Sequence, residues 1–390
     1  MIGVVTPFDF QRILGGGSQR IKSDLSALCA IGQEVEAILP SRIWRTAVSQ
    51  QEELTLVKYP SLKLPGNSSQ KTQQLLDMYT QSLNPFFRRA LGRRDKYYST
   101  VFAHFPWTAV ASYSVVGGKT PIVYVAHNFE YGLVRQATQN PVVRRIIHSL
   151  ERRACKSSTK ILCVSDHDRA NLGQAYEVPD KKLSVLPNTV DCAFFSQTSD
   201  LYDKHEERQR LELPPSSYVV LFHGRMDYRA NSDALTFVLS EVIPALKNSS
   251  IDVSVVVAGA QIPEWCLSNP YVFSYSDVPD MRRFLAIADA IIVPLRIGGG
   301  TRLKILESFA AGVPVISSVK GADGIECQDG SHILIAEESG EDFAKKVEAL
   351  ALNENLRKEI AGNAFNLVAR KYSISAAGNC YQEVIDSIAN

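Results

Sequence analysis

The fold class of this chain is decided by GGGTRLKILESFAAGVPVIS, residues 298–317. This stretch follows the short apolar run Ala290–Pro294 and ends in a second such run, Pro314–Ser318. Runs this apolar are typical of strands that are buried on both faces of a parallel sheet. Between them, three glycines lead into a helix, for which Thr301 is the expected N-cap. This order predicts parallel strands joined by a helix, which is the α/β class.

The same alternation of apolar runs and helix-length segments extends over the whole chain in two series. In the first half, the predicted strands are Ile2–Thr6, Val35–Leu39, Leu54–Tyr59, Thr100–His104, Ile122–His127, Lys160–Ser165 and Leu183–Leu186. In the second half, they are Tyr218–His223, Val253–Ala258, Tyr271–Tyr275, Ala290–Pro294, Pro314–Ser318 and His332–Ala336. A chain of 390 residues also exceeds what one hydrophobic core usually organises. We therefore expect two Rossmann-like parallel-sheet domains that face a central cleft, where ligands of such sheets bind.

The break between the two series lies near Ser196–Ser217, where charged and polar residues and a Pro-Pro pair replace the strand pattern. We interpret this segment as the inter-domain connection with a surface helix. The predicted domains are residues 1–192 and residues 193–372. Residues 373–390 form a predicted C-terminal helix that could return to the N-terminal domain.

The composition narrows the class of protein further. Apolar residues make up 45% and charged residues 21% of the chain, which is ordinary for a folded protein and excludes wholesale disorder. The formal net charge of +1 gives no overall electrostatic reason to expect nucleic-acid binding. The seven scattered cysteines include no CxxC pair and are expected as free thiols in a reducing compartment. With no apolar run of membrane-spanning length and no basic leader, we expect a cytoplasmic protein.

The glycine loop after Ala290–Pro294 has the features of an anion site. Arg302 and Lys304 lie in the first turn of the predicted helix, where the helix dipole disfavours cations. Two cations there are better explained if an anion such as a diphosphate lies between them and the exposed N–H groups of Gly299 and Gly300. Glu307, one turn further on, could accept hydrogen bonds from ribose hydroxyls. The alternative is a solvated Arg/Lys pair with an ion-paired glutamate.

A second glycine turn, Gly15–Gly17, follows the first predicted strand and precedes an amphipathic helix. Such a turn can bring backbone N–H groups of Gly16 and Gly17 close to a phosphate. It is not the dinucleotide-binding fingerprint, because Arg20 stands at the third glycine position and no acidic residue ends the second strand. A dehydrogenase is therefore disfavoured.

Four stretches together resemble glycosyltransferase family 4 and its group 1 relatives, which have the GT-B fold. Residues 298–317 resemble the signature of their C-terminal domain. FHGRMDY, residues 222–228, resembles the loop that holds the donor diphosphate. VLPNTVD, residues 185–191, resembles the segment at the domain junction, and VYVAHNFE, residues 123–130, resembles the strand whose terminal histidine approaches the transferred sugar.

The resemblance implies roles for individual residues. Those implied in catalysis are His127, Arg225 and Lys304. Those implied in donor binding are Gly16, Gly17, Asn188, Gly299, Gly300, Thr301, Arg302 and Glu307. Glu130 is the candidate acceptor-binding residue, although a structural ion pair with Arg135 is an equal alternative. His104 and His223 are expected to be core or edge histidines.

Two positions depart from the family pattern. The family usually has two glutamates eight positions apart, and Gly299 stands where the first is expected, while Glu307 supplies the second. Ala230 stands where a lysine usually follows the loop arginine, so Arg302 or Lys304 is expected to supply that charge from the other loop.

The resemblance implies transfer of a sugar from a nucleotide-diphosphate sugar to an acceptor hydroxyl, with retention of anomeric configuration. No cofactor and no metal are expected, since HExxH and clustered metal ligands are absent from the sequence. The donor nucleotide, UDP or GDP, stays open, and so does the acceptor, which can be a glycan, a lipid-linked molecule or a small molecule. The alternatives are a non-catalytic nucleotide-sugar-binding or scaffold subunit and another GT-B enzyme such as a sugar-nucleotide epimerase.

Residues 86–98, FFRRALGRRDKYY, form the one dense basic and aromatic patch. Such a patch can contact an anionic membrane surface or a phosphate-bearing acceptor. It can equally be a solvated helix and loop. Peripheral association with the inner face of the membrane is therefore left open.

Overall fold

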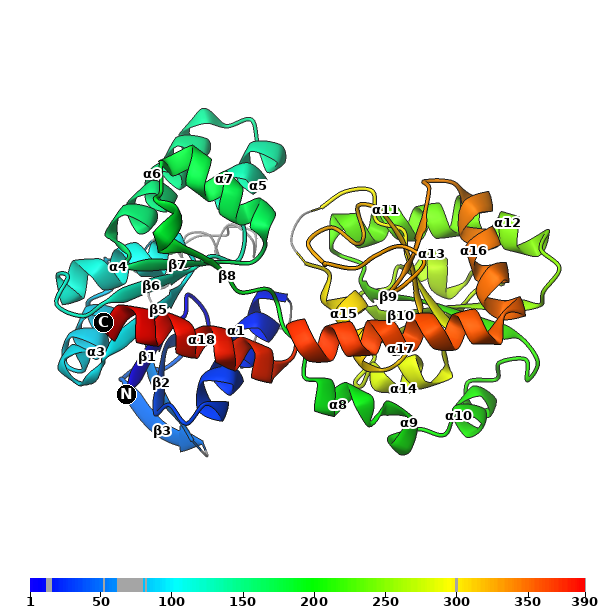
Figure 1. Cartoon of the computed structure of the whole chain (residues 1–390), viewed down its shortest axis with the longest axis horizontal. Coiled ribbons are helices and arrows are strands. Elements are labelled where there is room, and N and C mark those ends of the chain that lie inside the picture. The colour runs from blue at the N-terminus through cyan, green and yellow to red at the C-terminus, as the bar shows by residue number, and fades with distance from the viewer. Residues whose placement is uncertain (12–15, 52, 62–79, 81–82, 299–300, 390) are drawn as a thin grey trace. The chain divides into compact units, whose positions relative to one another are not determined.

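The computed structural model of the chain describes residues 1–11, 16–51, 53–61, 80, 83–298 and 301–389. The predicted site residues Gly299 and Gly300 lie outside the described residues. The chain divides into two compact units. The N-terminal unit comprises Met1–Thr189 with the residues from Ile374 onward, and the C-terminal unit comprises Val190–Ser373. Each unit has one sheet with helices on both faces (Figure 1).

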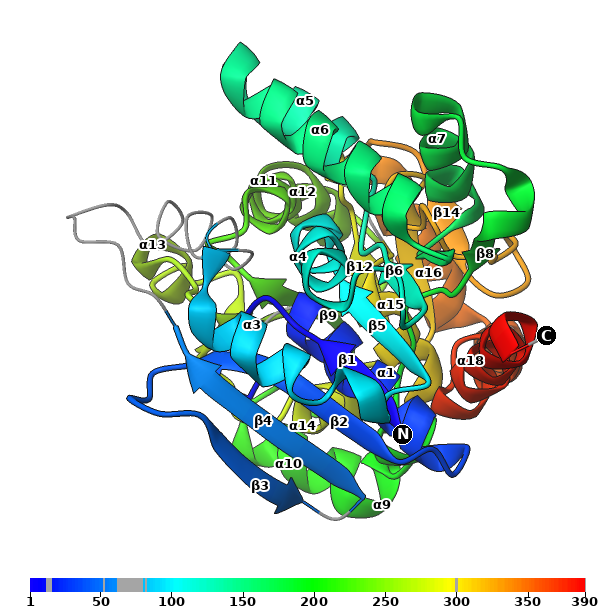
Figure 2. The same cartoon turned by 90° about the vertical axis from the view of Figure 1, so that its left-hand side faces the viewer.

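The sheet of the N-terminal unit has eight strands in the order β3-β4-β2-β1-β5-β6-β7-β8. In chain order they are β1 (Ile2–Val5), β2 (Val35–Ser41), β3 (Ala47–Gln51), β4 (Leu54–Pro60), β5 (Thr100–His104), β6 (Ile122–Val125), β7 (Lys160–Cys163) and β8 (Leu183–Val185). All neighbouring pairs are parallel except β3 and β4, which are antiparallel. The sequence predicts every one of these strands except β3. All residues of β3 are exposed at the sheet edge, so it carries no apolar pattern (Figure 2).

Both faces of the central strands of this sheet are buried, which is why β1, β5 and β6 are mostly apolar runs. In β5, Phe102 belongs to the core under α1 (Gly16–Ala30) and α18 (Ile374–Ala389). Its neighbours Val101 and Ala103 belong to the core under α3 (Pro85–Gly92), α4 (Pro106–Val116) and α6 (Pro141–Ser157). Successive side chains of a strand point to opposite faces, and each face here meets helices. The C-terminal helix α18 packs along α1 in this unit.

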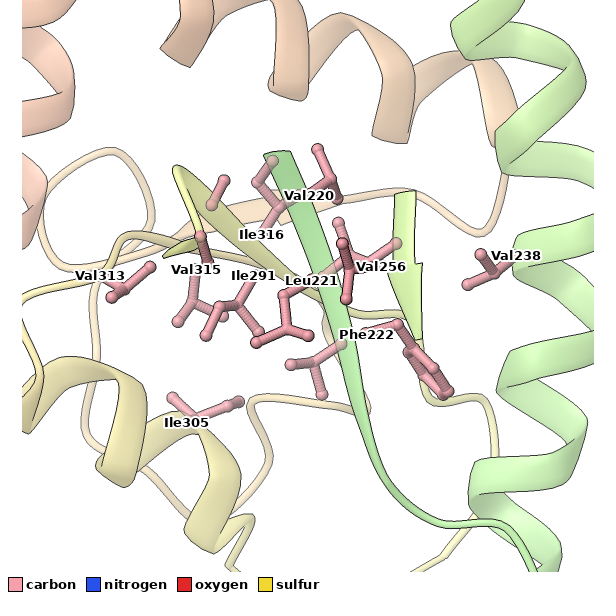
Figure 3. Close-up of a cluster of buried hydrophobic side chains, with 14 of the residues drawn as sticks. Val220, Leu221, Phe222, Val238, Val256, Ile291, Ile305, Val313, Val315 and Ile316 are labelled. Carbon is pink, nitrogen blue, oxygen red and sulfur yellow. The ribbon is translucent and has the colours of Figure 1, made fainter. Parts of the chain in front are cut away.

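The C-terminal unit has a six-stranded, wholly parallel sheet in the order β11-β10-β9-β12-β13-β14. Its strands are β9 (Tyr218–Arg225), β10 (Val253–Ala260), β11 (Phe273–Ser276), β12 (Ala290–Val293), β13 (Val315–Ser318) and β14 (Leu334–Ala336), all expected from the sequence. Its helices include α11 (Arg229–Phe237), α14 (Arg282–Ile287), α15 (Leu303–Ala310), α16 (Gly340–Leu352) and α17 (Glu354–Lys371). The core between sheet and helices is aliphatic, with Leu221 of β9 and Ile291 of β12 at its centre (Figure 3).

Residues Ser196–Ser217 lie in the C-terminal unit, within the predicted domain of residues 193–372, and contain a surface helix, while the boundary between the units falls at Thr189–Val190. They contain α9 (Thr198–Leu201) and α10 (Lys204–Arg210). Buried Glu207 is ion-paired with Arg283 of α14, and Arg208 binds Asp289 at 2.6 Å. The charged residues Glu207 and Arg208, which give this segment the composition of a linker, are therefore ion-paired with other residues of the C-terminal unit.

Candidate active site

Two glycines lie opposite each other near the carboxyl ends of neighbouring strands in the C-terminal sheet. Gly224 of β9 and Gly259 of β10 are partners in the parallel register, and their φ angles are 150° and 148°. A Cβ on Gly259 would lie 2.0 Å from the carbonyl oxygen of Gly224. The two backbones therefore approach so closely that residue 259 has room only for glycine.

The side chain of Lys304 occupies the space beside Gly224. Its Nζ donates to the carbonyl oxygen of His223 and, at 3.1 Å, to Oδ1 of Asn231. A Cβ on Gly224 would lie 3.0 Å from this Nζ, so the glycine makes room for the ammonium group. Burial lowers the pKa of Lys304 to about 7; Arg302 lowers it further and Glu307 opposes the shift. The site therefore holds a lysine whose positive charge is weakly stabilised. An incoming anion would favour the charged form of this lysine.

Arg302 lies at the N-cap position of α15 and is only 8% exposed. Burial lowers the pKa of its guanidinium, against the opposing effect of Tyr228. A Cβ on Gly298 would lie 3.1 Å from Nη2 of Arg302 and 3.3 Å from the Cβ of Ala230. Arg302 thus lies next to Ala230, the position at which the resembling family has a lysine.

Thr301 is not the helix cap that the sequence predicts. The helix begins at Leu303, and Arg302 is its N-cap residue without a side-chain capping bond. The Oγ1 of Thr301 is buried and has no hydrogen-bond partner within the described part of the chain. The glycine loop therefore enters the helix one residue later than expected, and Thr301 stays in the loop beside Gly324.

Arg225 and Glu307 are the other candidate donor-binding residues of this unit. Arg225 ends β9, is exposed, and forms a two-point ion pair with Asp227, at 2.7 Å and 3.1 Å. Asp227 raises the pKa of Arg225, so the guanidinium is charged. Glu307 lies on α15 one turn after Lys304 and is half-buried. The structure therefore brings Lys304, Arg302 and Glu307 to one helix start, and places Arg225 at the end of the neighbouring strand.

In the N-terminal unit, His127 follows β6 and is buried. Its Nε2 lies 2.9 Å from Nδ1 of His104, the last residue of β5. Its Nδ1 lies 3.9 Å from the point where a Cβ on Gly17 would stand. Burial lowers the pKa of His104 to about 3 and that of His127 well below its ordinary value. The two rings are therefore neutral, and Nδ1 of His127 lies on the side of the start of α1. His104 is buried, as expected for a core histidine, and it also contacts His127.

Phe105 fixes the orientation of His127 through a strained backbone. Its ring stacks on the imidazole with centroids 4.0 Å apart and planes inclined by 17°. Phe105 itself has φ 73° and ψ 154°, a conformation that costs a non-glycine residue roughly 1–3 kcal/mol and clusters at functional sites. Its carbonyl oxygen accepts a bond from Thr108 Oγ1 at 3.0 Å. No pattern in the sequence marks this residue, because the strain arises only from the turn between β5 and α4.

Asn188 is tied to α1 by Arg20. The Nη1 of Arg20 donates to Oδ1 of Asn188 at 2.9 Å, and its Nη2 donates to the carbonyl oxygen of Leu186 at 2.9 Å. The guanidinium is buried and paired with Asp24 at 2.7 Å. Arg20 therefore has a structural role at the third position of the glycine turn, where a dinucleotide-binding protein has glycine. Gly16 begins α1 and is exposed.

Glu130 begins α5 (Glu130–Ala137). Burial raises its pKa to about 8, with further increases from Glu151 and Asp168 and an opposing hydrogen bond from Asn128. Both Glu130 and Arg135 are described, and they form no ion pair; Arg135 lies over the ring of Tyr131 instead. Glu130 can therefore carry a proton at neutral pH and donate a hydrogen bond.

The turn that carries His127 and Glu130 is held by a buried carboxylate that sequence reasoning missed. Glu151 of α6 accepts bonds from the backbone N–H groups of Glu130 at 2.9 Å and Tyr131 at 3.0 Å, and from the Tyr176 hydroxyl at 2.8 Å. A signal was present, since Glu151 is the charged member of the helix face that also buries Ile147 and Ala154.

Two family profiles match this sequence. "Glycosyltransferase Family 4" matches residues 16–194, and "Glycosyl transferases group 1" matches residues 217–353. The chain belongs to the group 1 glycosyltransferases. The family predicted from the four stretches is thereby confirmed.

Curated relatives of this glycosyltransferase are similarly distant. The D-inositol 3-phosphate glycosyltransferase of Actinosynnema mirum is 26% identical over 71% of this chain and 70% of its own length. The UDP-Gal:alpha-D-GlcNAc-diphosphoundecaprenol alpha-1,3-galactosyltransferase of Escherichia coli is 23% identical over 65% of this chain and 68% of its own. Both are transferases, which supports the predicted transferase class over an epimerase or a non-catalytic subunit.

Solved structures confirm the GT-B fold of the glycosyltransferase. Sucrose-phosphate synthase from Thermosynechococcus elongatus matches with a TM-score of 0.76 and 15% identity over 99% of this chain and 98% of its own. Anabaena HepE in complex with UDP matches with a TM-score of 0.71 and 14% identity over 99% of both chains. Identities this low establish the fold alone.

Among the described residues of the glycosyltransferase, no group of three or more His, Cys, Asp or Glu side chains is placed to hold a metal ion. Likewise, none of the helices within those residues is long and apolar enough to span a membrane.

The basic patch at residues 86–98 of the glycosyltransferase is partly structural. Phe87 lies on the buried face of α3, and Arg94 is ion-paired with the buried Glu36 at 2.6 Å. Phe86 and Tyr97 remain exposed, so an interaction surface here is smaller than the sequence indicates.

Proposed function

We propose that this glycosyltransferase moves a sugar from a nucleoside-diphosphate sugar to an acceptor hydroxyl, with retention of configuration and without a metal ion. The observation that carries the proposal is the pair Arg302 and Lys304 at the start of α15. Both cations are desolvated, and both stand where the helix dipole is unfavourable to positive charge. A bound diphosphate would compensate both costs and would receive the N–H groups of the helix start.

The same groups would also assist the departure of the nucleoside diphosphate from the sugar. Charge develops on the diphosphate as its bond to the sugar breaks, and preorganised cations stabilise that charge most effectively when water is excluded. Lys304 and Arg302 are held in place before any ligand arrives, and Arg225 would join them by exchanging Asp227 for phosphate. Removing one such donor commonly lowers turnover by about 10²–10³-fold.

Roles on the acceptor side are proposed for His127 and Glu130. Both lie on the turn after β6, and both are neutral at pH 7 by the pKa shifts given above. Neutral groups there would orient a hydroxyl through hydrogen bonds without adding charge to the site. Retention follows from the family resemblance, and the anomeric configuration of the product, read by NMR, tests it.

A thermal-shift experiment tests the donor site directly. UDP comes first, because similar proteins are named with UDP or UDP-Gal, and GDP and ADP follow, each with and without EDTA. At 100 times its Kd, the correct nucleotide should stabilise the fold by about 2.7 kcal/mol. Lys304→Gln should lose the shift, and Lys358→Gln, in an exposed ion pair on α17, should retain it. A shift that EDTA abolishes would contradict metal-free binding, and no shift with any nucleotide would contradict the donor site.

A further inference from the structure

A buried chain of polar groups runs behind His127 in the N-terminal unit. His104 Nδ1 lies 2.9 Å from Nε2 of His127 and 4.0 Å from Oδ2 of Asp24. The same Oδ2 accepts the Nε–H of Arg20 at 2.7 Å. Every member of this chain is nine-tenths or more buried. The hydrogen bond between the two histidines therefore forms without competition from bulk water.

The position of the proton in this bond has two solutions. Each ring is neutral, so each carries one N–H and one acceptor nitrogen. In the first, Nδ1–H of His104 donates to Nε2 of His127, and the proton of His127 is then on Nδ1. In the second, Nε2–H of His127 donates to Nδ1 of His104, and the proton of His104 is then on Nε2.

The surroundings of His104 favour the first solution. Its Nε2 is buried and has no hydrogen-bond partner among the described residues. The second solution would leave an N–H there without an acceptor, and buried unpaired N–H groups are rarer in folded proteins than unpaired acceptors. It would also turn the Nδ1 lone pair of His104 toward the carboxylate of Asp24. The first solution instead directs an N–H toward that carboxylate.

We propose that His104 is a positioning residue that holds His127 as its Nδ1–H tautomer, so that His127 acts as a hydrogen-bond donor at the start of α1. That a ligand receives this bond rests on the proposed function; the tautomer itself does not. The stacked ring of Phe105 fixes the plane of the imidazole, and Nδ1 lies on the side of Gly17. His127 therefore cannot serve as a base through Nδ1, and the ligand atom it meets must be an acceptor oxygen.

The tautomer can be measured without any ligand or activity. Two-bond ¹H–¹⁵N correlation spectra of the ¹⁵N-labelled full chain distinguish protonated from unprotonated ring nitrogens, and His127→Gln assigns the His127 signals among the seven histidines. We expect an Nδ1–H pattern for both His104 and His127 at pH 7. An Nε2–H pattern for His127 in the wild-type protein would overturn the proposal.

Two variants separate positioning from simple packing. His104→Asn can still donate from its amide and should keep His127 as Nδ1–H, whereas His104→Phe cannot donate and should release His127 toward Nε2–H. The signals of His223, buried in the other unit, serve as the internal control. If His127 kept its tautomer in His104→Phe, the positioning role would be wrong. If His104→Phe fails to fold, the wild-type spectrum and His104→Asn still decide the question.

Sugar transfer, measured separately from the tautomer, distinguishes the positioning role of His104 from the proposed function. His127→Phe should lower sugar transfer by about 10²–10³-fold, as for other preorganised donors, with His104→Asn close to wild type. The expected tautomer without nucleotide binding or transfer would refute the proposed function and leave this inference intact. Transfer with an Nε2–H tautomer would do the reverse.

Discussion

Binding of a nucleoside diphosphate should draw a proton onto Lys304. The free ammonium has a pKa of about 7, because it is buried next to Arg302. An opposite charge within about 4–6 Å raises the pKa of a lysine by roughly 1–3 units. A bound diphosphate would therefore bring the pKa of Lys304 to about 9, taking the middle of that range.

The size of the uptake follows from these values. At pH 8 the free lysine is about one-tenth protonated and the bound lysine about nine-tenths, so each binding event takes up about 0.8 proton. At pH 6 both forms are protonated and the lysine takes up about 0.1 proton. Because protonation favours binding, nucleotide affinity should fall about 25-fold as pH rises from 7 to 9. The terminal phosphate of the nucleotide, with a pKa near 6, is already ionised at pH 8 and does not contribute.

Isothermal titration calorimetry in buffers of different ionisation enthalpy measures this number at pH 8. UDP is the first nucleotide, and Lys304→Gln should bind more weakly with an uptake near zero. Lys358→Gln, which removes an exposed lysine on α17, should match the wild-type protein. An uptake near zero in the wild-type protein, or an equal uptake in Lys304→Gln, would refute the reasoning.

Three further predictions concern stability and pH. Gly259→Ala should unfold the C-terminal unit or lower its melting temperature strongly, since the new Cβ would lie 2.0 Å from the Gly224 carbonyl oxygen. The control, Gly362→Ala, is at an open position in a helix and should be neutral or stabilising by up to about 1 kcal/mol in thermal unfolding. Glu151→Leu should lower the free energy of unfolding in urea by about 2–5 kcal/mol, because it leaves buried N–H and hydroxyl donors without an acceptor; an unchanged midpoint would contradict its role as a clamp. Glu130 is protonated below its pKa of about 8, so wild-type transfer at saturating donor should decline from about pH 8. Glu130→Gln should decline only from about pH 9, where Lys304 of the donor complex loses its proton; identical pH profiles at saturating donor would exclude Glu130 as a donor.

The fold was predictable because burial on both faces of a sheet leaves a strong trace in the sequence. Strands such as β1 and β12 carry no polar side chain and are buried throughout, and the pattern is unambiguous. β3 was not predicted because it is exposed along its whole length, and only its hydrogen bonds with β4 define it as a strand. The segment Ser196–Ser217 resembles a connection in the sequence because a charged surface helix and a linker have the same composition, and only the partners, such as Arg283 for Glu207, distinguish them.

The candidate site was predictable where one segment carries the chemistry. Arg302, Lys304 and Glu307 lie within six residues of one another, and glycines precede them. Residues that act across the fold were not found. His104 meets His127 over a separation of 23 residues, and Arg20 meets Asn188 over 168, so neither pair has a local signature. The strain at Phe105 is likewise a product of tertiary structure, since propensity alone would place no phenylalanine at φ 73°.

Lys304 and the buried histidines near the candidate sites differ in the pH at which they titrate, and this makes the proton measurement specific. Lys304 keeps a pKa of about 7, where a new negative charge changes its protonation. In the N-terminal unit, burial lowers the pKa of His127 well below its ordinary value and that of His104 to about 3, so neither imidazole titrates in the range of the calorimetry. His223, next to Lys304, also has a pKa of about 3. A proton taken up near pH 8 on nucleotide binding therefore belongs to Lys304 rather than to any of these imidazoles, and its loss in Lys304→Gln would locate the diphosphate at the start of α15.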